Sequence, residues 1–290
     1  MGVPIRLALV PEQVTISPSD LTQVSAALSK QVDQDFCPLW NVEATIDAFA
    51  QIEDVPSDYW QITIVAAVND AAGYHEDRSG QPFALVQFGE QWSLTASHEC
   101  LEMLADPFGR RVQGGNVPDQ ALSLGVALAR VNYLVEACDP CESAAAAYQV
   151  NGVLVSDFIT PHYYDSEASA GTRYSFTGAI AAPRQILPDG YISWQDQETQ
   201  HWMQLRMFAD NVSNSIPHIV DVTSETRFDR ARELGNVRAA MDRVTKAPPN
   251  GAGLVGMKLE RTQARANASL TAREARARIR REDIARLMGK

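Results

Sequence analysis

Residues 95–107 read Thr-Ala-Ser-His-Glu-Cys-Leu-Glu-Met-Leu-Ala-Asp-Pro. In a helix, residues four positions apart lie on one face, about one turn from each other. His98 and Glu102 can therefore point the same way and hold one metal ion together, with Glu99 beside them as a general base. Metal-ligand residue types, helical spacing and a candidate base coincide here, so this segment is the starting point for predicting both fold and function.

The residues around this motif are mostly apolar, which bears on whether the helix is buried. They include Ala96, Cys100, Leu101, Met103 and Leu104. The alternative is a surface helix on which His98 and Glu102 form an ordinary pair four residues apart. Titratable groups on a largely buried helix are costly unless they are paired or bind a metal. We therefore favour a metal site over a surface helix.

The sequence before this helix predicts a sheet covered by helices. An apolar run at Ile5–Val10 predicts a first strand, and the apolar spacing between Leu21 and Val32 predicts an amphipathic helix. Further strands are expected at Trp40–Phe49, Trp60–Val68 and Phe83–Phe88. This order predicts an α/β (α+β) fold with a mixed sheet. We expect the last strand to lie at an edge, where it could hold an extended peptide by β-augmentation.

Two other histidines lie in segments that we predict to be loops. His75, followed by Glu76 and Asp77, falls in the polar stretch Asn69–Gln81 and could form a second ion site, although a solvated loop is favoured. His162 follows a predicted hairpin with an Asn-Gly turn at residues 151–152. It could be a ligand or, with a neighbouring tyrosine, a donor to an oxyanion. An aromatic cluster under a loop explains it equally well.

The segment around His98 resembles the active-site helix of zincin metallopeptidases, with an HExxE motif in place of HExxH. The predicted strand order is also similar to the zincin N-terminal sheet, and the resemblance covers roughly residues 1–165. It implies a zincin-like fold, zinc as the cofactor and a peptide or protein substrate. The function expected from it is that of a metal-dependent hydrolase, a zinc metallopeptidase.

The gluzincin branch of that family implies further site residues. There a glutamate from a second, downstream helix is the third ligand, and an aspartate shortly after it orients the histidine. Glu136 matches that glutamate, and Asp139 approximately matches that aspartate at a spacing one residue shorter. The resemblance thus implies His98, Glu102 and Glu136 as ligands and Glu99 as general base. Asp106, one turn beyond Glu102, is a further candidate for a ligand or an orienting group.

The glutamate in place of the second histidine changes the expected chemistry. Two carboxylates and one imidazole are a harder and more anionic ligand set than two imidazoles and one carboxylate. Such a set accepts zinc, but it shifts the preference toward oxygen-preferring ions such as manganese or calcium. A non-catalytic structural or assembly protein that keeps the zincin-like fold is therefore the alternative to a peptidase.

Composition limits the remaining function classes. The formal net charge of -11 makes non-specific nucleic-acid binding an unfavoured function. No apolar run approaches the roughly 18 residues that span a bilayer, and we expect no signal peptide. The four cysteines, Cys37, Cys100, Cys138 and Cys141, are too few for a disulfide scaffold, so we expect reduced thiols and a cytoplasmic location.

The chain divides, by composition, into a body and a basic tail. We expect a zincin-like domain over residues 1–225, a helical segment over 226–247, a Pro/Gly-rich linker over 248–257 and a basic helical tail over 258–290. A basic helix attached to an acidic body favours docking onto a protein partner or self-association into an oligomer. The alternative is a solvated terminal helix.

Overall fold

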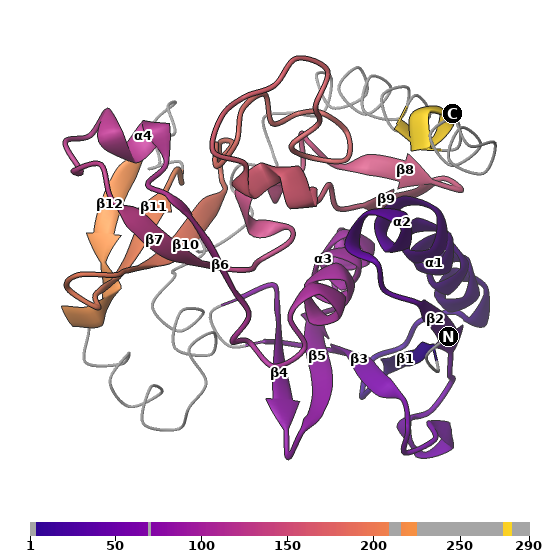
Figure 1. The fold of residues 1–290 in the computed structure, drawn as a ribbon. Helices are drawn as coiled ribbons and strands as arrows, with labels where there is room; N and C mark the ends of the chain where they lie inside the picture. Colours follow the sequence, from indigo (N-terminus) through magenta and orange to yellow (C-terminus); the bar gives the residue numbers. More distant parts are fainter. Residues whose placement is uncertain (1–3, 69–70, 209–215, 225–274, 280–290) are drawn as a thin grey trace.

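The computed structural model describes residues 4–68, 71–208, 216–224 and 275–279. Its first half contains a five-stranded sheet of order β2-β1-β3-β5-β4 (Figure 1). Four of the strands are parallel, and β4 runs antiparallel to β5. This mixed sheet confirms the predicted fold class. The strands are β1 (Ile5–Pro11), β2 (Ala44–Ala48), β3 (Trp60–Val65), β4 (Gly73–Arg78) and β5 (Gln81–Gln87).

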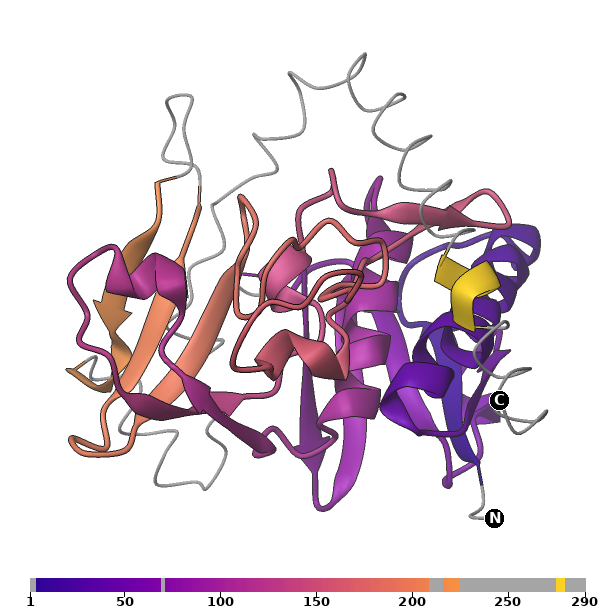
Figure 2. The ribbon, with the colours of Figure 1, turned by 45° about the horizontal axis from the view of Figure 1, so that its top comes forward.

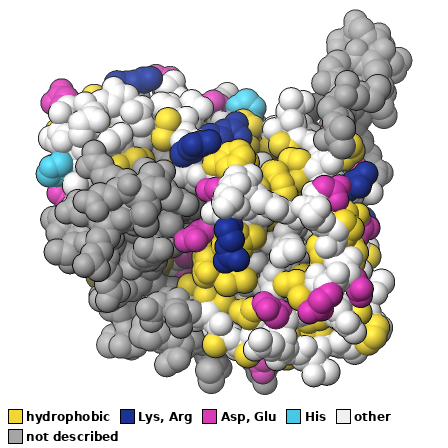
Figure 3. All heavy atoms as spheres, turned by 90° about the horizontal axis from the view of Figure 1, so that it is seen from below, with side chains coloured by type: hydrophobic (Ala, Val, Ile, Leu, Met, Phe, Trp, Pro, Cys, Tyr) yellow, Lys and Arg dark blue, Asp and Glu magenta, His cyan; other side chains and the backbone are white. Residues whose placement is uncertain are grey.

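Two helices of this half, α1 (Pro18–Gln31) and α3 (Trp92–Ala105), pack against the sheet on one side (Figure 1). Ser17 caps α1, because its hydroxyl accepts the Asp20 N–H. The chain then continues through a π-helical turn, Val32–Phe36, into the short helix α2 (Cys37–Trp40). The apolar stripe predicted for α1 is buried in the core. On the opposite side of the molecule, apolar side chains are mixed with charged ones (Figure 3).

The second half builds an antiparallel sheet of order β12-β11-β10-β7-β6. Its strands are β6 (Val112–Asn116), β7 (Arg130–Leu134), β10 (Tyr191–Asp196), β11 (Trp202–Arg206) and β12 (His218–Asp221), with the short helix α4 (Asp119–Leu122) after β6. The last three of these strands could not be predicted from local patterns, because aromatic and polar residues mix there without a clear period.

A long, largely irregular segment, residues 135–190, lies between the two sheets (Figure 2). It holds the hairpin β8 (Tyr148–Val150) and β9 (Val153–Val155) and two 3-10 turns, η3 (Asp139–Cys141) and η4 (Pro161–Tyr164). Asn151 and Gly152 both have positive φ, as an Asn-Gly hairpin turn requires, so this predicted turn is confirmed. Short 3-10 turns and loops bring polar side chains from this segment toward α3.

Two sequence-based expectations about the first sheet are wrong. The stretch Asn69–Gln81 is not a loop throughout, because residues 73–78 form β4 and pair with β5 across a tight turn at Ser79 and Gly80. As a result β4, and not the strand predicted at Phe83–Phe88, occupies the sheet edge. The charged composition of β4 hid it, since edge strands commonly carry charged side chains.

The predictions for residues 226–274, including the linker, lie outside the described residues. In the predicted basic tail, residues 275–279 are described and helical. Ala275 is buried there against the body of the protein, and Arg276 pairs with Asp35. Among the residues that the structure describes, no helix combines the length and apolar character needed to cross a membrane.

Candidate metal centre

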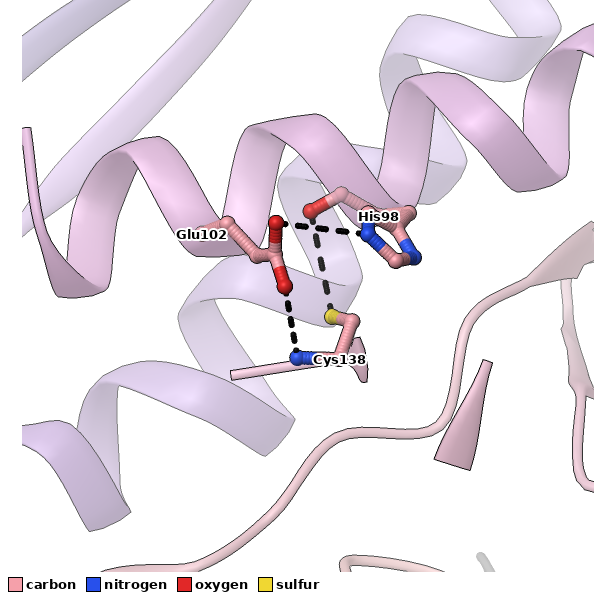
Figure 4. Close-up of side chains that lie close together, drawn as sticks. All are labelled: His98, Glu102 and Cys138. Carbon is pink, nitrogen blue, oxygen red and sulfur yellow. Dashed lines mark hydrogen bonds and ion pairs between the residues drawn. The ribbon is translucent and has the colours of Figure 1, made fainter. Parts of the chain in front are cut away.

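Helix α3 presents the motif residues toward the protein interior. His98 Nε2 lies 3.3 Å from Glu102 Oε2, as expected for side chains one helical turn apart (Figure 4). Glu102 is fully buried and Glu99 is 4% exposed, whereas the His98 side chain keeps 14% of its surface exposed. The apolar residues that alternate with them are buried in the core. The helix is therefore the buried one that the sequence indicated.

The segment after β7 supplies the residues that face this helix. Asp139 Oδ1 lies 3.2 Å from His98 Nε2. Glu102 Oε1 accepts the backbone N–H of Cys138 at 3.0 Å and that of Asp139 at 3.3 Å, and Figure 4 shows the first of these contacts. Two backbone donors thus fix the Glu102 carboxylate in place. Its other oxygen, Oε2, remains directed at the imidazole of His98.

Glu136 also reaches this group, although from an unexpected element. Oxygen atoms of Glu102, Glu136 and Asp139 lie within 4.8 Å of one another. Glu136 does not come from a second helix, as the resemblance implied, because it follows strand β7 in an irregular stretch. Asp139 lies in the 3-10 turn η3 and is close enough to His98 to be a ligand itself.

Strand β4 brings a second histidine to the same place. His75 is fully buried, and its Nδ1 lies 3.3 Å from Glu99 Oε2 and 3.8 Å from Glu102 Oε2. The solvated loop that the sequence favours for His75 is therefore wrong, since the residue is buried in a strand. The missed signal was the turn at Ser79-Gly80, which marks a hairpin with the apolar strand that follows.

Among the residues that the structure describes, four trios of side chains have ligand atoms close enough to share an ion. Imidazole and carboxylate groups dominate them, and one also includes a thiol. They are His98, Glu102 and Cys138; His75, Glu99 and Glu102; His98, Asp139 and Glu142; and Glu102, Glu136 and Asp139.

Opposing influences set the pKa of His98. Burial disfavours the imidazolium form, but the carboxylates of Glu102 and Asp139 outweigh it and hold the pKa well above its usual value. Burial and the nearby Asp139 raise the pKa of the Glu142 carboxyl group. Without a cation, the cluster therefore retains protons that a bound metal would displace.

The thiol of Cys138 is a poorer ligand than its carboxylate neighbours. Its Sγ lies 3.8 Å from the His98 carbonyl oxygen (Figure 4). Burial, reinforced by Glu102, holds the pKa of the thiol well above its usual value. Since only the thiolate binds metals well, the imidazole and carboxylate groups are the better donors here. All four cysteines are free, in keeping with the expected reduced thiols.

Two predicted site residues lie elsewhere. The carboxylate of Asp106 accepts the backbone N–H of Arg111 at 2.7 Å and belongs to none of the four trios. His162 is 63% exposed and pairs with Asp165 at 2.9 Å, so the structure does not bring it to this group. Burial, followed by the negative charge of Glu136, raises the pKa of the phenol of its neighbour Tyr164.

No known protein family, curated protein or solved structure matches the chain. The residues of the candidate centre are therefore the basis for a functional proposal.

Proposed function

We propose that this protein is a zincin-like, metal-dependent hydrolase that cleaves peptide bonds. The observation that carries the proposal is the meeting of His98, Glu102 and Asp139 from two distant segments, with Glu99 adjacent on the same helix. Hydrolysis assisted by a metal ion needs at least a metal site and a neighbouring carboxylate that can accept a proton.

The donor set fits a divalent cation. His98 Nε2 lies at hydrogen-bond distance from a carboxylate oxygen of Glu102 and from one of Asp139, and oxygens of Glu102, Glu136 and Asp139 lie within 4.8 Å of one another. One imidazole with carboxylates accepts zinc and suits manganese or calcium still better. A cation held there would polarise a substrate carbonyl and make a water molecule more acidic.

Glu99 is the candidate proton acceptor. It follows His98 directly in α3, and its Oε2 is held 3.3 Å from His75 Nδ1. That contact orients the Glu99 carboxylate. A positioned general base of this kind typically contributes about 10²–10⁴-fold to a hydrolysis rate.

The edge strand supports a peptide as the substrate. β4 lies at the end of the sheet beside α3, and its His75 contacts the site. An extended peptide that paired with this edge would run alongside the metal centre. We therefore assign extended polypeptide, rather than a compact small molecule, as the substrate class.

The test combines metal content with cleavage of an unfolded polypeptide. We expect the wild-type protein to bind zinc or manganese and to cleave the polypeptide, and a chelator to stop cleavage. Glu99→Gln should retain metal at the His98 site but lose about 10²-fold or more in rate. His98→Ala should lose both metal and activity, while the exposed His162→Ala should retain both. A metal-free wild-type protein after zinc and manganese loading, or an active Glu99→Gln variant, would contradict the proposal.

A second candidate is a non-catalytic assembly protein that docks through its basic tail, residues 258–290. The observation that favours it is the pairing of Arg276 with the buried Asp35, since the body offers an acidic receptor for a tail helix. The same receptor could take the tail of another copy. A chain ending at residue 257 should then differ from the full chain in the number of subunits that light scattering measures. The same number of subunits in both proteins would remove this candidate.

We further propose a reducing, cytoplasmic setting. All four cysteines are free, and three of them are buried, Cys138 among the residues of the candidate centre. Oxidation there would disturb packing around α3, so a reducing compartment suits the fold. Assaying metal binding with and without a thiol reductant tests this, and equal binding in both would weaken it.

A further inference from the structure

The carboxylate of Glu102 lies close to two imidazoles, those of His98 and His75. Its Oε2 is 3.3 Å from His98 Nε2 and 3.8 Å from His75 Nδ1. Two backbone N–H groups hold its Oε1, so the position of Oε2 between the histidines is fixed by the fold. A buried oxygen that two imidazoles approach from different elements has the arrangement of a shared ligand.

The two histidines fall in different groups of closely spaced ligand atoms. Within the described part of the chain, no trio of closely spaced ligand atoms contains both His75 and His98. His75 instead groups with Glu99 and Glu102, while His98 groups with residues of the 136–142 segment. The cluster therefore divides into two sets that have Glu102 in common.

We propose that His75, Glu99 and Glu102 form a second divalent-cation site, which shares Glu102 with the first. The protein then holds a pair of ions bridged by one carboxylate. Two-metal sites typically place their ions about 3.5–4 Å apart, a separation that one bridging oxygen can span. Zinc or manganese is the class of ion that one imidazole and two carboxylates would take.

This inference rests on the proposed function for the first ion but adds a separate ligand set. The alternative arrangement is a hydrogen-bonded network in which His75 serves only as the partner of Glu99. The number of bound ions distinguishes the two.

The experiment measures ions per chain in the full-length protein. After saturation with zinc or manganese and removal of unbound metal, we expect two ions in the wild type and one in His75→Gln. Glu99→Gln should also lose one ion, which gives a second variant if His75→Gln fails to fold. His162→Gln and His201→Gln are matched controls, because each removes an exposed histidine paired with an aspartate. Both controls should retain two ions.

Manganese loading provides an independent readout. Two ions that share a carboxylate should give an exchange-coupled paramagnetic resonance signal, which His75→Gln should convert to that of an isolated ion. One ion in the saturated wild type, or two ions retained in His75→Gln and Glu99→Gln, would overturn the second site and leave the first intact. No bound ion would overturn both proposals.

Discussion

The Oδ1 atom of Asp139 lies 3.2 Å from Nε2 of His98, so the turn after β7 closes directly onto the motif helix. This contact makes Asp139 a candidate ligand, whereas the resemblance implied only a group that orients His98. The same turn donates two backbone N–H groups to Glu102. One short segment thus fixes both motif residues at once.

Replacing Asp139 with asparagine tests that assignment. Loss of one anionic donor should weaken metal affinity at least about tenfold, the lower end of the effect of removing a group that supports a ligand. Competition with a chromophoric chelator measures the change. Asp165→Asn is the control, because the Asp165 side chain pairs with the exposed His162, and it should leave the affinity unchanged. Equal affinities for wild type and Asp139→Asn would remove Asp139 from the site.

Metal should stabilise the folded chain. A ligand at about 100 times its dissociation constant adds about 2.7 kcal/mol to the free energy of unfolding if it binds only the folded state. We therefore expect a higher melting temperature with zinc or manganese and a reversal by chelator. In His98→Ala the same metal addition should shift the melting temperature much less. A shift of equal size in both proteins would place the stabilising ion elsewhere.

Metal binding should also strengthen as pH rises. Glu102 and Asp139 hold the pKa of His98 well above its usual value, against the effect of burial, and a metal needs the neutral imidazole. In the metal-free protein, the contribution of His98 to folding stability changes in the opposite direction and falls as pH rises. Stability from the protonated His98 is fully present below its unfolded pKa, near 6.5, and is lost as pH rises through the raised folded pKa. Chemical denaturation of wild type and His98→Gln, each with chelator, measures this difference across pH.

Asp157 offers a pH test away from the proposed metal ligands. Burial raises its pKa to about 6, although the Thr177 N–H and hydroxyl both donate to its carboxylate. The folded state therefore favours the protonated acid, and the stability this gives is lost as pH rises from about 4 through 6. Relative to wild type, Asp157→Asn should gain roughly 3 kcal/mol between pH 4 and pH 7. A difference that stays constant with pH would contradict the account of this carboxyl group.

The contact between the tail residue Arg276 and Asp35 predicts a loss of stability when the Arg276 side chain is removed. Its guanidinium donates to both oxygens of Asp35, with Nη2 2.7 Å from Oδ2, and Asp35 is fully buried. Arg276→Ala would leave that carboxylate without its cation, at a cost on the order of 3 kcal/mol. The double variant Arg276→Ala/Asp35→Asn should recover part of the loss. Urea denaturation of the wild type, Arg276→Ala, Asp35→Asn and the double variant completes the cycle. No loss of stability in Arg276→Ala would show that the tail does not dock in solution.

Local patterns predicted much of the first half of the fold. Strands β1, β3 and β5, helices α1 and α3 and the Asn-Gly hairpin all follow from apolar period and turn chemistry. Those signals are short-range, so they do not specify which strand lies at an edge. The charged strand β4 was missed for that reason, and its buried His75 with it.

Helical spacing predicted the candidate ligands on α3, but it did not predict the candidate ligands that face them. Glu136 and Asp139 lie in a segment with little regular structure, where spacing does not determine position. Their approach to His98 depends on how the strand β7 and the turn η3 cross the end of α3. Only tertiary structure settles such a crossing, and it is what turns Asp139 into a candidate ligand.

The most direct test of the metal centre is an anomalous-difference map from crystals of the full chain grown with saturating zinc or manganese. We predict a strong peak at bonding distance from His98 Nε2, Glu102 Oε2 and a carboxylate oxygen of Asp139 or Glu136. A map with ordered side chains at these residues and no peak among them would contradict the account.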